Sequence, residues 1–419
     1  MQKQTAEHKA RRAGLLGAIF LMATSAIGPG FLTQTATFTA KLGAAFAFAI
    51  FVSVLLDIAI QLNVWRVIAV SKMRAQELGN AVIPGLGWFM SVLIVIGGVV
   101  FNIGNIGGAG LGANALLGVD ARVGGIVTAV LAIGFFLSRR AGLALDRALV
   151  VLGVVMIVVT AIVAVKSNPP VGDALRNMVM PETIDMLAII TLVGGTVGGY
   201  ITYAGAHRML DSGAGGVEHL AQTTRSSVTS IIVTAIMRFL LFLAVLGVVA
   251  AGAKLNLEGN PAAEAFQFVA GDLGMRFFGV VLWAAGISSI VGASYTSATF
   301  LTKSSASTAT SAEQGADSET EKAARKRQNT VTIMLIAIST LLFGAIGTAP
   351  ATLLVFAGAF NGLVLPIGVT VLIYIALFRS DLLGGYKYPK WLAAVGIIGV
   401  VIAWYLAWRS FGGVFEMLG

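Results

Sequence analysis

The sequence has no cysteine among its 419 residues, so disulfide bonds and thiolate metal sites are excluded. Charge is also scarce: Asp, Glu, Lys and Arg together make up 11% of the chain, against about 25% in a typical soluble protein. There is no nucleotide-binding P-loop, no His-Glu-x-x-His pattern, and no loop long enough to hold a nucleotide-hydrolysing domain. We therefore expect neither an enzyme nor an ATP-driven pump.

Apolar residues are abundant instead. They make up 57% of the chain, and the mean hydropathy is +0.89. The charges cluster and leave apolar stretches of about 20 residues between them, the length at which a helix crosses a bilayer. The sequence therefore predicts an all-α polytopic membrane protein with a single domain over residues 1–419. Eleven spanning segments are expected near residues 14–39, 43–70, 85–115, 122–138, 145–166, 183–209, 226–252, 273–301, 329–347, 350–377 and 389–410.

Basic residues are distributed unevenly between the two sides of this predicted bundle. Lys and Arg number 20 on the side of the N-terminus and 7 on the opposite side, and Arg238 lies within a span. Because basic loops stay in the cytoplasm, the N-terminus is predicted to be cytoplasmic. The same loops explain the net charge of +9, so we expect a lipid bilayer and no nucleic acid as a partner. The longest polar loop, 303–329, is predicted to be a cytoplasmic linker.

Two of the predicted helices are interrupted by glycine. The first is broken at 28–30, Gly-Pro-Gly, and the sixth at the two Gly-Gly pairs 194–195 and 198–199. One break opens a first set of five helices, 14–166, and the other opens a second set, 183–377, which leaves 389–410 as an extra helix. Paired breaks in corresponding positions indicate an inverted-repeat transporter with a central site. Backbone freed inside a membrane is tolerated where it lines a cavity.

Polar side chains are rare in the predicted helices, and each one needs a partner. Asn102 and Asn105 are three residues apart and share one helix face. They either bond neighbouring helices or recognise a polar substrate, since an amide both donates and accepts hydrogen bonds. Tyr200 follows the second break and is a further ligand candidate. Ser288 and Ser289 either bond their own helix backbone or offer oxygens to a monovalent cation.

Asp57 and Arg238 are the clearest charges inside predicted spans. An ionisable group within a membrane is a functional candidate by default. Asp57 also lies four residues before Gln61, so a local polar network is an equal alternative. His207 is expected at the cytoplasmic end of the sixth helix, where anchoring and gating are both open.

Four segments of the chain resemble the Nramp family of metal transporters, which share the LeuT-type fold. Residues 28–31, GPGF, stand where that family has Asp-Pro-Gly-Asn, and residues 194–207 stand where it has a Met-Pro-His motif. Residues 102–114 are similar to its third helix, and residues 286–300 to its eighth. The resemblance covers nearly the whole chain. It implies a 5+5 inverted repeat with broken helices 1 and 6, in a multi-pass protein of the bacterial inner (plasma) membrane.

The departures from this family concern its metal site. The ligands there are the Asp and Asn of helix 1 and the Met of helix 6, and these positions correspond to Gly28, Phe31 and Gly198. Transition metals bind imidazole, carboxylate or sulfur ligands, and magnesium binds oxygen ligands that usually include a carboxylate. Since the aligned positions supply none of these side chains, we expect no resident metal.

Other aligned positions have also changed. The helix 3 carboxylates of the family, which transfer protons, correspond to Asn102 and Asn105, which do not titrate. The helix 6 His corresponds to Tyr200, and the helix 10 Gln to Gly358. A site of glycines, amides and a phenol suits a neutral or anionic molecule better than an uncompensated dication.

We therefore expect a secondary transporter that imports a small polar organic solute, with a carboxylate. Relatives that carry this pattern are labelled divalent metal transporters, and some are encoded beside 5-oxoprolinase genes, which makes 5-oxoproline a candidate. The alternatives are a transporter of magnesium or manganese and, from another class, a sensor that does not transport. The predicted substrate-binding residues are Gly28, Gly30, Phe31, Asn102, Asn105, Gly198, Gly199 and Tyr200.

Transport is expected to be coupled to an ion gradient, with no cofactor apart from a sodium ion. In LeuT-type transporters, sodium is held by carbonyls at the helix 1 break and by hydroxyls of helix 8, which the segment 285–289 resembles. The predicted coupling-ion residues are Ser25, Ala26 and Ile27, through their carbonyls, and Ser288 and Ser289, through their hydroxyls. Protons remain the alternative, because Asp57 and His207 are retained. The sequence leaves the oligomeric state open.

Overall fold

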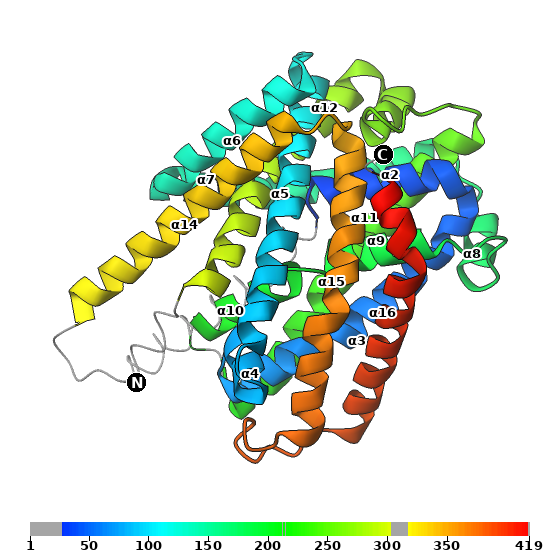
Figure 1. Cartoon of the computed structure of the whole chain (residues 1–419). Coiled ribbons are helices and arrows are strands. Elements are labelled where there is room, and N and C mark those ends of the chain that lie inside the picture. The colour runs from blue at the N-terminus through cyan, green and yellow to red at the C-terminus, as the bar shows by residue number, and fades with distance from the viewer. Residues whose placement is uncertain (1–26, 212, 214, 303–316, 418–419) are drawn as a thin grey trace, which may run out of the picture.

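The computed structural model describes residues 27–211, 213, 215–302 and 317–417, and all regular structure in this part of the chain is helical (Figure 1). Two 3-10 turns, Gly43–Ala45 and Val217–His219, join longer helices. The α-helices are α2 (Pro29–Leu42), α3 (Phe46–Ser71), α4 (Ala75–Val82), α5 (Leu86–Leu117), α6 (Ala121–Leu137), α7 (Arg139–Lys166), α8 (Val171–Val179), α9 (Met186–Thr196), α10 (Ile201–Asp211), α11 (Leu220–Ala250), α12 (Pro261–Leu301), α14 (Asp317–Ala345), α15 (Pro350–Phe378) and α16 (Lys390–Glu416).

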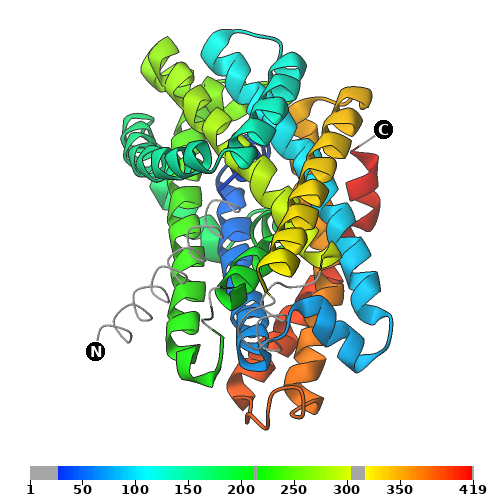
Figure 2. The same ribbon diagram turned by 90° about the vertical axis from the view of Figure 1, so that its left-hand side faces the viewer.

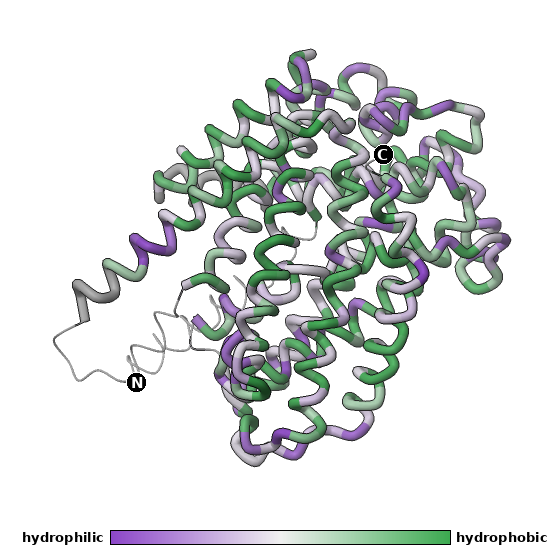
Figure 3. Tube along the Cα trace, viewed as in Figure 1, coloured by the Kyte–Doolittle hydropathy of each residue, from purple (hydrophilic) through white to green (hydrophobic). Residues whose placement is uncertain are grey.

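The helices agree with the predicted number of membrane spans. By length and hydropathy, eight stretches of the described residues are able to cross a membrane. One of them contains both α2 and α3, while α6 and the second half of α7 fall outside the count because each is shorter. Counting these separately gives the eleven predicted spans. Large apolar side chains such as Leu131, Val165 and Trp408 remain exposed, as expected for surfaces that contact lipid. Figure 3 shows the long helices coloured mostly green, for hydrophobic residues, or in pale shades.

Close packing in the centre depends on glycine. Helix α5 packs most extensively on α12, α15 and α6. A β-carbon on Gly112 of α5 would lie only 2.5 Å from the backbone nitrogen of Trp283 in α12. Small residues at such positions let helix backbones approach within a membrane, where association rests on packing. Helix α2 is also central: eleven of its fourteen residues are buried, and Figure 2 shows it, in blue, inside the bundle.

The first predicted break is confirmed at its C-terminal side. Gly28 has an extended backbone (φ −92°, ψ −175°), and α2 begins immediately after it. The predicted break covers residues 28–30, but Pro29 is already the first residue of this half-helix. The ring of proline presets a helical φ, and its missing N–H costs nothing in the first turn. Residues 14–26, the first half of the predicted span, lie outside the described residues.

The second break is narrower than predicted. Helices α9 and α10 are separated by residues 197–200, and Gly199 has φ +53°. This left-handed conformation favours glycine. The prediction of a further break at Gly194 and Gly195 was wrong, because both are helical residues of α9. Their missing side chains serve packing instead: a β-carbon on Gly195 would lie 2.5 Å from the Gln34 side chain, and one on Gly194 would overlap the Gly358 carbonyl.

Two other boundaries differ from the predictions. The linker predicted over 303–329 is helical from residue 317, where α14 begins, and residues 303–316 lie outside the described part. Residues 317–329 are rich in Ala, Glu, Lys and Arg, which have high intrinsic helix propensity, so the helix extends beyond the apolar span. Helix α12 begins at Pro261, twelve residues before its predicted start, and is kinked at Gly271 (φ +64°).

Candidate functional site

The first break, at Gly28, lies against two other helices. A β-carbon on Gly28 would lie 2.7 Å from the hydroxyl oxygen of Ser289 in α12 and 3.8 Å from the amide oxygen of Asn105 in α5. Glycine at this position therefore keeps the backbone of the break close to both polar side chains. The structure brings together three of the residues that the sequence singled out.

Tyr200 joins this group from the second break. Its hydroxyl is next to the Asn105 amide, and its ring packs edge-on against Phe101, with 5.6 Å between the ring centroids. Apart from this contact between Tyr200 and Asn105, the four polar atoms of the group lack a hydrogen-bond partner among the described residues: the hydroxyls of Tyr200 and Ser289 and both amide atoms of Asn105. Each of these side chains is buried. A buried polar group without a partner costs about 1–3 kcal/mol, so this cluster is suited to bind a polar ligand.

Asn102, one turn earlier on α5, is only half available. Its amide nitrogen donates a hydrogen bond of 2.9 Å to the Ser294 hydroxyl of α12. Its amide oxygen has no partner among the described residues. The packing alternative therefore accounts for the nitrogen of Asn102, whereas neither amide atom of Asn105 is used in this way.

The remaining predicted substrate residues are divided between several contacts. Gly30 faces Phe101, since a β-carbon there would lie 3.7 Å from that ring. Phe31 lies instead beneath the Arg238 guanidinium, 4.2 Å from its ring centroid, within an apolar cluster. Gly198 packs against the last turn of α9, and Gly199 contacts the side chain of Asn361. The structure thus does not bring Phe31 into the group around Asn105.

Sequence reasoning missed two buried amides beside the breaks. Gln34 donates a 2.9 Å hydrogen bond to the carbonyl of Leu354, and its amide oxygen has no partner among the described residues. Asn361 donates to the carbonyls of Gly97 (3.0 Å) and Ala357 (2.8 Å), and its amide oxygen also lacks a partner. Asn361 stands alone in an apolar run, which is the signal that could have found it, whereas Gln34 is flanked by Thr33 and Thr35 and carries no such signal.

Of the side chains predicted to bind the coupling cation, one lies at the first break in the described part of the chain. Ser289 lies beside Gly28, whereas Ser288, about 100° further round the helix, is half-buried. Ile27 packs with an apolar cluster, and Ser25 and Ala26 lie outside the described residues.

Acidic residues do not gather at the breaks. Over the described ranges, no group of three or more His, Asp or Glu side chains could hold a metal ion. Asp57 of α3 lies near Arg238 of α11 and the hydroxyl of Thr196, the last residue of α9. The predicted network between Asp57 and Gln61 is not supported, because the amide nitrogen of Gln61 donates to α11 instead, to the carbonyl of Ser227 and the hydroxyl of Ser230.

His207 belongs to a different cluster at the far end of α10. Its Nδ1 lies 3.2 Å from the Thr299 hydroxyl of α12. Arg74 bonds the Thr299 carbonyl (3.2 Å) and forms an ion pair of 2.9 Å with Asp211. This cluster ties α4, α10 and α12 together at the side predicted to be cytoplasmic, which is consistent with either anchoring or gating.

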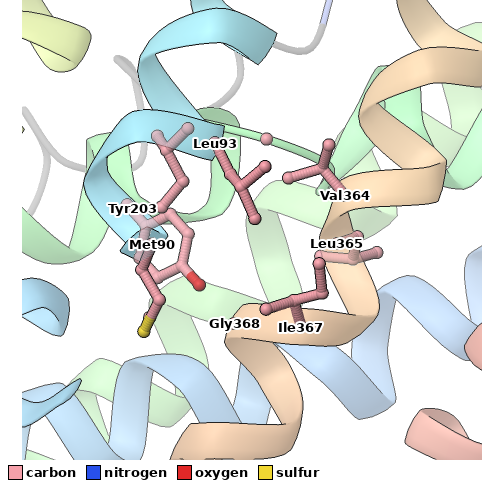
Figure 4. Close-up of a pocket in the computed structure, with 9 residues that line it drawn as sticks. Met90, Leu93, Tyr203, Val364, Leu365, Ile367 and Gly368 are labelled. Atoms are coloured by element: carbon pink, nitrogen blue, oxygen red, sulfur yellow. The ribbon is translucent and has the colours of Figure 1, made fainter. Parts of the chain in front are cut away.

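An apolar pocket opens beside the second break (Figure 4). It reaches Gly199, and the hydroxyl of Tyr203 is the one polar side-chain atom on its wall. None of the predicted polar ligands lines it. The lining residues are Met90, Leu93, Ile94, Gly199, Tyr203, Val364, Leu365, Ile367 and Gly368.

Residues 19–411 match the Nramp family, described as natural resistance-associated macrophage protein-like. The uncharacterized membrane protein YcsG of Bacillus subtilis is 49% identical over 402 residues, which cover 96% of this chain and 95% of that protein. An uncharacterized membrane protein of Haemophilus influenzae is 49% identical over 400 residues, 96% of each chain.

Solved structures with the same fold include transporters of different cargo. The manganese transporter of Eremococcus coleocola, in complex with an aromatic bis-isothiourea compound, has a TM-score of 0.69 at 15% identity and covers 96% of this chain and 86% of its own. MhsT in complex with L-phenylalanine has a TM-score of 0.62 at 15% identity, covering 96% and 98%. Mhp1, a nucleobase-cation-symport-1 transporter with bound bromovinylhydantoin, has a TM-score of 0.54 at 14% identity, covering 95% and 92%.

Proposed function

The chain belongs to the Nramp family of multi-pass membrane transporters, and we propose that it imports a small polar organic solute rather than a metal ion. The observation that carries this proposal is the uncharged cluster of Asn105, Tyr200 and Ser289 around Gly28. Its hydroxyls and its amide can both donate and accept hydrogen bonds. A neutral or anionic organic molecule uses both capacities, whereas a metal ion uses only acceptors.

The start of α2 supports an anionic group on the solute. The first N–H groups of a helix have no partner within the helix, and the positive end of its dipole attracts anions. Pro29 has no N–H, so Gly28, Gly30 and Phe31 supply these donors. Because Gly28 has no side chain, a carboxylate can approach this backbone while the rest of the molecule contacts Asn105.

5-Oxoproline is the candidate that we would test first. Its ring amide offers one donor and one acceptor, which complement the two amide atoms of Asn105, and its carboxylate suits the start of α2. Two of the neighbours with this fold hold organic molecules, L-phenylalanine and bromovinylhydantoin. The fold is therefore compatible with such cargo.

The alternative is a divalent cation, favoured by the family and by the manganese transporter among the structural neighbours. A dication at Gly28 would lack compensating charge, because the acid near the breaks, Asp57, is opposite Arg238. Transition metals also prefer carboxylate, imidazole or sulfur ligands over the amide, phenol and hydroxyl of this cluster.

A sodium ion beside Ser289 is proposed as the coupling ion. Its unpartnered hydroxyl next to the helix 1 break supports this position. A hard monovalent cation binds such hydroxyl oxygens together with freed backbone carbonyls.

The experiment is a binding and uptake comparison with the purified chain. Thermal unfolding is measured with 5-oxoproline, with other small carboxylates and with manganese, since a ligand that binds the folded state raises its stability. Uptake of the same compounds is then measured in proteoliposomes. We expect stabilisation and uptake with a small carboxylate and neither with manganese. Saturable manganese uptake that is lost when Gly28 is replaced by valine would contradict the proposal and establish the metal alternative.

A further inference from the structure

A column of buried polar groups lies between α3 and α11. It is distinct from the site described above. Along α11, polar residues recur every three or four positions on one face, each at most 5% exposed. Such a stripe is costly inside a membrane, where every polar group needs a partner. The residues of this stripe are Thr223, Ser226, Ser227, Ser230, Thr234 and Arg238.

The middle of the column is held by Gln61 of α3. Its amide nitrogen donates to the carbonyl of Ser227 (3.0 Å) and to the hydroxyl of Ser230 (3.1 Å). The amide oxygen of Gln61 and the hydroxyl of Ser227 are buried and have no partner among the described residues. The column therefore contains polar atoms whose hydrogen-bonding capacity is unused, although it lies between two apolar helices.

The outer end of the column is half-buried. There Arg66 donates 3.0 Å hydrogen bonds to the hydroxyls of Thr224 in α11 and Tyr386 in the loop after α15. Arg66 and Asp57 are nine residues apart on α3, which corresponds to about 14 Å along a helix. The column thus runs from one end of the bundle to a buried carboxylate at its middle.

The inner end meets both broken helices. The Arg238 guanidinium donates to the hydroxyl of Thr196, the last residue of α9, at 3.1 Å. It also stacks on the ring of Phe31, the third residue of α2, at 4.2 Å. Two of its nitrogens have no hydrogen-bond partner in the described part of the chain. One buried cation therefore connects the two half-helices next to their breaks.

Asp57 is the carboxylate that interacts electrostatically with Arg238, although no direct hydrogen bond joins the two side chains in the described part of the chain. Of the charged and titratable groups on the helices packed against α3, Arg238 is the one that interacts with this carboxylate, with Thr196 beside it. His207 of α10 is engaged with Thr299 instead. A proton added to Asp57 removes the negative charge and leaves a buried guanidinium uncompensated, which weakens its hold in this position.

We propose that Asp57 is a proton-binding site, reached along the α3–α11 column, whose charge controls the attachment of Arg238 to α9 and α2. The hydroxyls of Thr223, Ser230 and Thr234 donate to backbone carbonyls one turn earlier in the chain. A proton taken up from water at the half-buried end therefore reaches the carboxylate only as these hydrogen bonds rearrange, and the broken helices loosen when it arrives. This inference goes beyond the proposed function, since it holds for an organic or a metallic cargo. It is also compatible with sodium at Ser289, which lies on α12.

The test uses the absence of native cysteine. Val197, a buried residue of the second break, is replaced by cysteine, and its rate of labelling by a membrane-permeant thiol reagent is measured from pH 5.5 to 8 in the full-length protein. A cysteine at the exposed Ala221 corrects for the pH dependence of the reagent. We expect the corrected rate at Val197→Cys to rise as the pH falls.

The decisive variant is Asp57→Asn, which has the shape of the protonated acid. It should label fast at every pH, while Asp57→Glu and His207→Gln keep the pH dependence. If Asp57→Asn retains the pH profile of the parent, the proposal is overturned. Should Asp57→Asn not fold, Thr196→Val removes the hydroxyl that accepts from Arg238 and donates to the Leu192 carbonyl: loss of the pH dependence supports the proposal, and an unchanged profile overturns it.

Discussion

Two buried polar regions lie within this bundle, and they differ in charge. The cluster of Asn105, Tyr200 and Ser289 around the first break is neutral, and outside the cluster its polar atoms lack partners among the described residues. The column between α3 and α11 ends in a pair of opposite charges, Asp57 and Arg238. Neutral groups that donate and accept hydrogen bonds are suited to recognise a ligand. A charge pair responds to a single proton, because removing one charge leaves the other buried alone.

The largest effect is expected in the charged region. Arg238→Met leaves the Asp57 carboxylate buried without its counter-charge, and removing one partner of a buried pair costs about 3–5 kcal/mol. We expect a large fall in the thermal unfolding temperature of the purified protein. The double variant Asp57→Asn with Arg238→Met should recover most of that stability while remaining inactive in uptake. Equal destabilisation in the single and double variants would show that the two charges do not interact.

The next effect concerns the second break. Gly199→Ala places a side chain at φ +53°, which costs about 1–2 kcal/mol, and it also overlaps the Asn361 amide. Asn361 cannot move away easily, since it is buried and donates to two carbonyls. We expect reduced stability and loss of uptake. Gly134→Ala is the matched control, because a β-carbon there meets no neighbour and Gly134 lies within α6. A comparable loss of stability and uptake in both variants would show that the break has no special role.

The neutral cluster should respond in binding more than in stability. Asn105→Ala removes one partner of a substrate hydrogen bond, worth about 1–3 kcal/mol, so KM for uptake should rise roughly tenfold. Asn102→Ala instead leaves the Ser294 hydroxyl without its donor and should lower the unfolding temperature. Initial uptake rates and thermal unfolding separate the two outcomes. If uptake is unchanged in both variants, these asparagines serve helix packing.

The smallest effect is expected at the proposed cation position. Ser289→Ala should blunt the stimulation of uptake by an inward sodium gradient, because it removes a hydroxyl beside the first break. Ser288→Ala, on a different side of α12, is the control and should retain the stimulation. Uptake that ignores sodium and follows an imposed pH gradient would leave the coupling to Asp57 alone.

Much of this architecture could be predicted from residue types in order along the chain. The eleven spans follow from apolar runs of bilayer length, and the breaks at Gly28 and Gly199 follow from glycine and proline inside such runs. The break predicted at the pair Gly194 and Gly195 was wrong, because glycine occurs both at turns and where helices pack closely. The predicted linker, 303–329, was too long at its C-terminal end, because residues of high helix propensity extend α14 beyond the hydrophobic span.

The candidate site was predicted less completely. Asn105, Tyr200 and Ser289 were found because single polar residues in apolar helices are rare. Asn361 carries the same signal, whereas Gln34 lies between two threonines. The importance of both depends on facing Gly199 and Gly195 across helix interfaces. The sequence by itself determined a membrane bundle with two broken helices, since hydropathy and backbone freedom are local properties. Only the tertiary structure decided that Phe31 lies beneath Arg238 rather than beside Asn105, and that Asp57 lies opposite Arg238. Those contacts join helices far apart in the chain, and no local preference specifies which face of one helix meets another.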